Sequence, residues 1–146
     1  MKQFALVTGA SKGLGRAFSL ELGSRGMNTI LVSLPGEDIH LLNEEIIQKY
    51  GTTSVFFEVD LSDYDNVISF TKLINDQYSI FLLINNAGIG GTMKFEDANV
   101  NLVNKIVQLN VMAVSVLTRQ LIPNLAKQAQ SYVLNISSLA AFNPVG

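Results

Sequence analysis

The sequence predicts an α/β fold, in which a doubly wound parallel sheet carries helices on both faces. Short apolar runs alternate with segments of helical periodicity along the whole 146-residue chain. Such an alternation is typical of parallel strands joined by right-handed helical crossovers. In addition, a glycine-rich turn joins the first apolar run to the first helical segment, and polar clusters follow several of the later runs.

The first unit is a predicted strand at residues 3–8 followed by a helix at about 14–25. Between them Gly9, Gly13 and Gly15 have the spacing G-x-x-x-G-x-G. Glycine permits unusual backbone angles at such a turn, and the start of the helix directs free N–H groups at a phosphate. The spacing is not the dinucleotide fingerprint G-x-G-x-x-G, so a tight turn without a ligand is the alternative interpretation.

The second unit is a strand at 28–33, which is apolar or β-branched in its centre and therefore expected to be covered on both faces. Pro35-Gly36 ends this strand. A helix is predicted at about 37–50. Glu37 and Asp38 are interpreted as acids of its first turn, where the helix dipole favours negative charge.

Three more strands are predicted, at 54–59, 80–84 and 132–136. Asp63 is expected to cap the helix that follows the first of them. A polar loop after the second leads into a long helix at about 99–125, which Pro123 kinks or ends. The apolar stripe predicted for this helix consists of Val103, Ile106, Val107, Val111, Val114, Leu117 and Leu121.

Four clusters of glycine or polar residues fall directly after predicted strands. They are Gly9–Gly15, Asp60, Asn85–Gly88 and Ser137-Ser138. Ligands of parallel α/β sheets bind outside the carboxyl ends of the strands. The shared position of these clusters therefore predicts a ligand site at one edge of the sheet.

Composition bounds the function further. Hydrophobic residues make up 48% of the chain, which is enough for one domain or part of one. The net charge is −2 and no basic cluster occurs, so a nucleic-acid partner is not expected. The chain has no cysteine, which excludes disulfides and thiolate metal sites, and no metal site is expected around its single histidine, His40. A strand close to Met1 and the lack of an apolar stretch of roughly 18 residues predict a cytoplasmic protein without a leader or a membrane span.

Taken together, five motifs resemble the short-chain dehydrogenase/reductase family. They are the turn Thr8–Gly15, Asp60, the Asn85-Asn86-Ala87-Gly88 run, Asn110, and Asn135–Ser138. The resemblance covers essentially the whole chain. It implies a Rossmann-type fold with five of the usual seven strands, and hydride transfer between a nicotinamide cofactor and an alcohol or ketone.

The resemblance also assigns roles to residues. Ser138 would hydrogen-bond the substrate oxygen, and Asn110 would anchor a water in the proton path. The residues implied to bind the cofactor are Gly9, Ser11, Lys12, Gly13, Leu14, Gly15, Ser33, Asp60, Leu61, Asn86, Ala87 and Gly88.

NADP(H) is the favoured cofactor, with NAD(H) as the alternative. NAD-binding sites usually have an acid at the end of the second strand, where this chain has Ser33. Lys12 can meet a 2′-phosphate, as the basic residue at this place does in the family. Leu34 replaces an arginine often found just past the second strand, which argues in the other direction.

The catalytic Y-x-x-x-K pair of the family is not found. None of the four tyrosines has a lysine four residues later, and the sequence stops eight residues after Ser138. We therefore expect residues 1–146 to be an incomplete dinucleotide-binding domain, the N-terminal part of an enzyme and inactive by itself. A homo-oligomer formed through the long helix near Asn110 is also expected. The alternatives are a non-catalytic nucleotide-binding fragment or regulator, and another nucleotide-binding α/β domain such as a methyltransferase.

Overall fold

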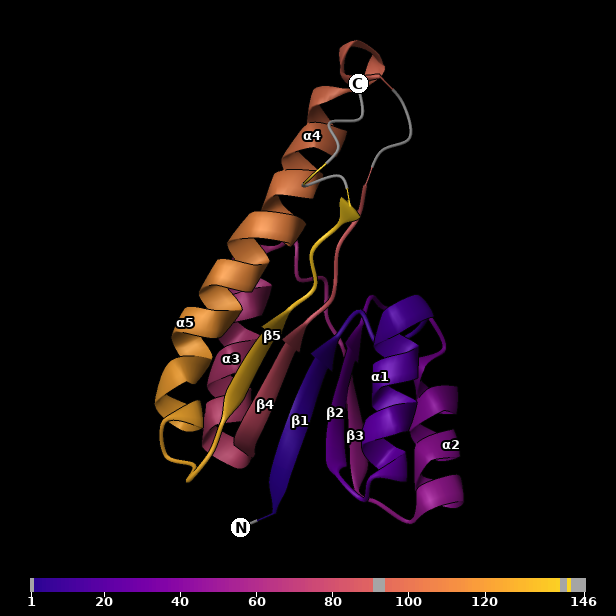
Figure 1. Ribbon diagram of the computed structural model, residues 1–146. Coiled ribbons are helices and arrows are strands. Elements are labelled where there is room, and N and C mark those ends of the chain that lie inside the picture. Colours follow the sequence, from indigo (N-terminus) through magenta and orange to yellow (C-terminus); the bar gives the residue numbers. More distant parts are fainter. Residues whose placement is uncertain (1, 91–93, 140–141, 143–146) are drawn as a thin grey trace.

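The computed structural model describes residues 2–90, 94–139 and 142. They form a parallel sheet with helices on both faces (Figure 1), as predicted. The strand order in the sheet is β3-β2-β1-β4-β5. The strands are β1 (Gln3–Thr8), β2 (Asn28–Ser33), β3 (Ser54–Glu58), β4 (Ser79–Asn85) and β5 (Tyr132–Asn135). The helices are α1 (Gly13–Ser24), α2 (Ile39–Tyr50), α3 (Tyr64–Gln77), α4 (Val100–Val107) and α5 (Val114–Leu125), with a short 3₁₀ turn at Phe95–Asp97.

The two faces of the sheet carry separate cores. Helices α1 and α2 cover one face, and α3 and α5 cover the other (Figure 1). Alternate residues of β1 supply both cores, because successive side chains of a strand point to opposite faces. Phe4 and Leu6 pack toward α3 and α5, whereas Ala5 and Val7 pack toward α1 and α2. Burial on both faces explains why the central strands are continuously apolar.

The start of α2 differs from the prediction. The helix begins at Ile39, and its N-cap, Asp38, has a left-handed backbone with φ of 50°. This turn of the chain stops the helix from extending back to Glu37. The interpretation of Glu37 as an acid of the first helical turn is therefore wrong, and its side chain has another partner, described below.

The long helix is interrupted by a π-helical segment, Gln108–Ala113, between α4 and α5. Bonding from residue i to i+5 adds a residue to the turn and rotates the side chains that follow. Val111, inside this segment, is 59% exposed, and Val107, directly before it, is 49% exposed, although both belong to the predicted stripe. Leu117 and Leu121 of the predicted stripe are buried, together with Leu109, Ala113 and Leu125, which the stripe did not include. Pro123 lies in the last turn and the helix ends two residues after it.

The expectation that no segment is long and apolar enough to span a membrane is wrong. The joined helix Val100–Leu125 has 26 residues and a mean hydropathy of 1.5 over its most apolar window, so by length and composition alone it can cross a membrane. A single such helix is weak evidence for a span, since helices of soluble proteins pass the same test. In this helix 17% of the most apolar window is buried, and the buried side chains pack in the core with α3 and the sheet.

Candidate functional site

The turn between β1 and α1 leaves the start of the helix open. Gly9 and Gly13 have φ of +63° and +57°, a conformation that other residues rarely adopt. Lys12 is the N-cap and its side chain makes no capping hydrogen bond. A Cβ built on Gly13 meets no atom of the described chain within 4 Å. There is thus open space beside the helix start, and the first N–H groups of a helix have no acceptor within the helix, which is the arrangement that binds a phosphate.

Gly15 lets α1 approach the ends of β1 and β4. A Cβ at this position would lie 2.1 Å from the Gly9 carbonyl oxygen and 2.5 Å from Asn86 Nδ2. That Nδ2 donates to the carbonyl oxygens of Thr8 and Gly9, at 3.0 and 3.1 Å. The Asn86 amide therefore holds the glycine turn in shape from the neighbouring strand.

Thr8 joins the same two strand ends through its side chain. Its Oγ1 accepts from the N–H groups of Asn86 and Ala87, both at 3.0 Å, and donates to the Ile84 carbonyl at 3.3 Å. The side chain is buried, so these bonds form away from water. The sequence analysis assigned Thr8 no role beyond its place in the motif.

A cleft of about 570 Å³ opens at the carboxyl ends of β4 and β5. It brings together Asn86, Ala87, Gly88, Asn110 and Ser138 of the predicted site. The remaining lining residues are Asn85, Ile89, Gly90, Val114, Asn135, Ile136 and Ser137.

Asn110 lies in the π segment and holds the loop that follows β4. Its Oδ1 accepts from the Ile89 N–H at 3.0 Å, and its Nδ2 donates to the Ile89 carbonyl at 2.7 Å. A Cβ at Gly88 would lie 3.2 Å from Asn110 Oδ1, so the loop approaches the helix closely. Within the described residues, the Asn110 amide therefore bonds the backbone at one wall of the cleft.

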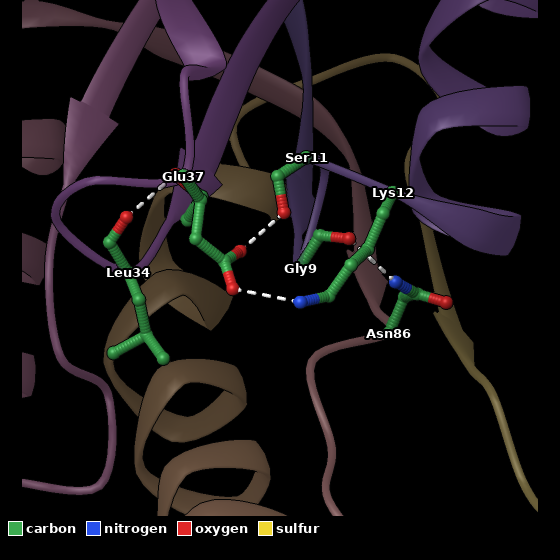
Figure 2. Close-up of polar contacts among 7 residues, drawn as sticks. Gly9, Ser11, Lys12, Leu34, Glu37 and Asn86 are labelled. Carbon is green, nitrogen blue, oxygen red and sulfur yellow. Dashed lines mark hydrogen bonds and ion pairs between the residues drawn. The ribbon is translucent and has the colours of Figure 1, made fainter.

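A smaller cavity of about 210 Å³ lies between the turns that follow β1 and β2. Its lining is Gly9, Ser11, Lys12, Leu34, Glu37, Asn86, Ala87, Gly88, Ile89 and Leu109. The Glu37 carboxylate accepts hydrogen bonds from the Ser11 hydroxyl and from Lys12 Nζ, the latter at 2.8 Å (Figure 2). The bonds from Lys12 and Ser11 hold the pKa of Glu37 below its ordinary value of 4.5.

The sequence analysis missed this role of Glu37. A signal for it existed, because the turns after two neighbouring parallel strands must lie side by side at the sheet edge. Residues after Ser33 were therefore candidates to reach the turn after Thr8.

Six predicted residues are not among the residues that line these two cavities. Three of them, Gly13, Leu14 and Gly15, lie at the start of α1. The other three are Ser33, Asp60 and Leu61. Ser33 is buried, and its hydroxyl donates to the Leu34 carbonyl at 3.1 Å. Leu61 is buried in the core. Asp60 accepts from the hydroxyl and the N–H of Ser62, at 2.6 and 2.9 Å, and these bonds lower its pKa. No group of three or more His, Asp or Glu side chains that could hold a metal gathers anywhere in the described residues.

Comparison with known proteins agrees with the family resemblance seen in the sequence. The profile of the family described as short chain dehydrogenase matches residues 3–146. The chain is 29% identical to the very-long-chain 3-oxoacyl-CoA reductase of Anas platyrhynchos, over 97% of this chain and 46% of the relative. It is 31% identical to the reductase of the same name from Phaeosphaeria nodorum, over 97% of this chain and 43% of the relative.

Solved structures agree in fold. A metagenomic short-chain oxidoreductase in complex with NADP superposes with a TM-score of 0.89 at 30% identity, covering 99% of this chain and 66% of that one. A bulky-bulky ketone specific alcohol dehydrogenase from Comamonas testosteroni superposes with a TM-score of 0.90 at 26% identity, covering 99% and 57%. The chain spans about half the length of the curated relatives cited above.

Proposed function

Because the chain belongs to the short chain dehydrogenase family, we propose that it forms the cofactor-binding part of an oxidoreductase that transfers a hydride between NADP(H) and an alcohol or ketone. The observation that carries this proposal is the convergence of the strand-end groups. The open helix start, the Asn86–Gly88 run, Asn110 and Ser138 lie along one edge of the sheet, at the carboxyl ends of β1, β4 and β5.

The residues present fit a dinucleotide. The space above Gly13 and the free N–H groups of the first turn of α1 suit a pyrophosphate. Lys12 adds a positive charge beside the cavity between β1 and β2, where a ribose phosphate is expected from the resemblance. The metagenomic short-chain oxidoreductase of the same fold was solved in complex with NADP, which supports the choice of cofactor.

The larger cleft suits the reacting end of the substrate. When bound, the nicotinamide supplies or accepts the hydride. Ser138, in the lining of this cleft, is proposed to donate a hydrogen bond to the substrate oxygen and so to polarise its bond to carbon. Asn110 is proposed to keep the loop after β4 at the distance that leaves this cleft open, through its two bonds to Ile89.

A second copy of the chain is the proposed protein partner. Val107, Val111 and Ile122 of the long helix are 49%, 59% and 47% exposed. An exposed apolar row of this kind is typical of a helix that packs on another subunit.

A pair of substitutions at Gly13 tests the phosphate site. Asn and Asp are the residues that best tolerate positive φ, and a Cβ here meets no described atom within 4 Å, so both variants should fold. Gly13→Asp places a negative charge at the helix start, whereas Gly13→Asn is its neutral match. We expect NADPH, measured by isothermal titration calorimetry, to bind Gly13→Asp at least about tenfold more weakly than Gly13→Asn, because charges a few ångströms apart repel by more than 1 kcal/mol.

Two results would contradict the proposal. Equal affinities of the two folded variants would place the pyrophosphate elsewhere. Binding of S-adenosylmethionine but not NADPH to the unsubstituted protein would favour a methyltransferase instead.

A further inference from the structure

Glu37 occupies the position where a cofactor phosphate is expected. Its carboxylate lies between Ser11 and Lys12, on the wall of the cavity between the turns after β1 and β2 (Figure 2). The side chain of Glu37 is 27% exposed and that of Lys12 is 80% exposed. Glu37 is therefore the more enclosed partner, and Lys12 reaches to it from the solvent side.

The backbone on both sides of Glu37 is constrained. Asp38 has a left-handed φ of 50°, and the N–H of Gly36 donates to Glu58 Oε1 at 2.9 Å. These features direct the Glu37 side chain from the turn after β2 back toward the turn after β1. The contact with Lys12 is thus built by the fold of the turn, unlike an ion pair between two neighbours on one helix.

The contact changes what Lys12 and Ser11 can offer to a ligand. The positive charge of Lys12 is offset by the carboxylate, and the Ser11 hydroxyl is already donating. A ribose 2′-phosphate carries between one and two negative charges and needs donors, so it must displace the carboxylate to reach them. A ribose 2′-hydroxyl, in contrast, can donate a hydrogen bond to the carboxylate where it stands.

We propose that Glu37 is a specificity-determining residue, which lowers the preference for NADP(H) over NAD(H) by occupying the Ser11 and Lys12 side chains. The inference rests on the proposed function, since it concerns the cofactor of the same site. This chain has a lysine in the glycine turn and no acid at position 33, yet Glu37 places a carboxylate against that lysine, where the ribose is expected.

The test is Glu37→Gln, with Glu45→Gln as its matched control. Glu45 also pairs with a cation of the neighbouring segment, Arg16 at 2.5 Å, but does not line the cavity. Affinities for NADPH and NADH are measured by calorimetry on the full-length protein. Glu37→Gln should raise the ratio of NADPH to NADH affinity by about two- to fivefold, the size of an ion pair of this exposure, and Glu45→Gln should leave it unchanged.

Lys12→Gln supplies the second measurement. If Glu37 acts by occupying Lys12, then Lys12→Gln weakens NADPH binding more in the Glu37→Gln background than in the unsubstituted protein. A ratio that Glu37→Gln leaves unchanged, or effects of the two substitutions that simply add, would overturn the inference while the proposed function stands. Failure of both nucleotides to bind the unsubstituted protein would instead refute the proposed function.

Discussion

Replacing Gly15 by alanine tests whether close contact between α1 and the strand ends shapes the site. Gly15 lies inside α1 without a positive φ, so the substitution would ordinarily stabilise the helix by about 1 kcal/mol. The structure predicts that Gly15→Ala destabilises the protein instead. The new Cβ would lie 2.1 Å from the Gly9 carbonyl oxygen, about 1.3 Å closer than the 3.4 Å at which ordinary contact begins.

The size of the stability loss depends on which groups the new Cβ displaces. The Gly9 oxygen is backbone, so the helix and the turn have to separate, and overpacking of this kind costs about 1–3 kcal/mol. The Cβ would also lie 2.5 Å from Asn86 Nδ2, whose bonds to Thr8 and Gly9 are disturbed at about 1 kcal/mol each. After the helix gain is subtracted, the free energy of unfolding should fall by roughly 2–4 kcal/mol.

Urea unfolding followed by circular dichroism measures this change. With a urea slope of about 2 kcal/mol/M, the midpoint should fall by roughly 1–2 M. Gly13→Ala is the control, because its Cβ meets no described atom within 4 Å and only the strain of positive φ remains, about 1–2 kcal/mol. A Gly15→Ala variant as stable as the unsubstituted protein, or more stable, would refute the packing argument.

Three further predictions concern stability and assembly. Folding lowers the pKa of Glu37, so the contribution of this carboxylate to stability is full above pH 4.5 and is lost as the pH falls through the folded pKa. Between about pH 5 and pH 3 the unfolding temperature should therefore fall less in Glu37→Gln than in the unsubstituted protein. An equal fall of the unfolding temperature in both proteins would contradict this. Asp63 is the N-cap of α3 and accepts a hydrogen bond from the Asn66 N–H at 2.9 Å. In urea titrations, Asp63→Ala should lower the free energy of unfolding by about 1 kcal/mol. Asp65→Ala, a control in the first turn of the same helix, should lower it by less than about 0.5 kcal/mol. Among the described residues, strand β5 pairs only with β4, and Val133 is 41% exposed. Val133→Lys should therefore reduce self-association measured by sedimentation velocity. A monomeric unsubstituted protein would show that this strand edge does not drive self-association.

Sequence patterns determined the order of strands and helices. Apolar runs and helical periodicity are local properties, and the sheet follows from them because parallel strands need helical crossovers. Local chemistry also located the breaks. Asp63, the expected cap of the helix after β3, accepts a hydrogen bond from the first turn of α3.

The same patterns predicted that most residues of the candidate site lie at one edge of the sheet. Clusters that follow parallel strands must share that edge, and the structure places Asn86–Gly88 and Ser138 around one cleft. Their chemical roles remain proposals, because spacing shows where residues lie and not what they bind.

Tertiary structure alone decided the contacts between segments distant in sequence. The phase of the long helix depends on a π segment that no residue pattern marks, and this segment turns Val111 outward and leaves Asn110 bonded to Ile89. The bond from Lys12 to Glu37 joins residues 25 apart and depends on the left-handed turn at Asp38. Sequence periodicity describes which side of an element is apolar, whereas these contacts depend on how far neighbouring turns protrude, which only the packed sheet edge determines.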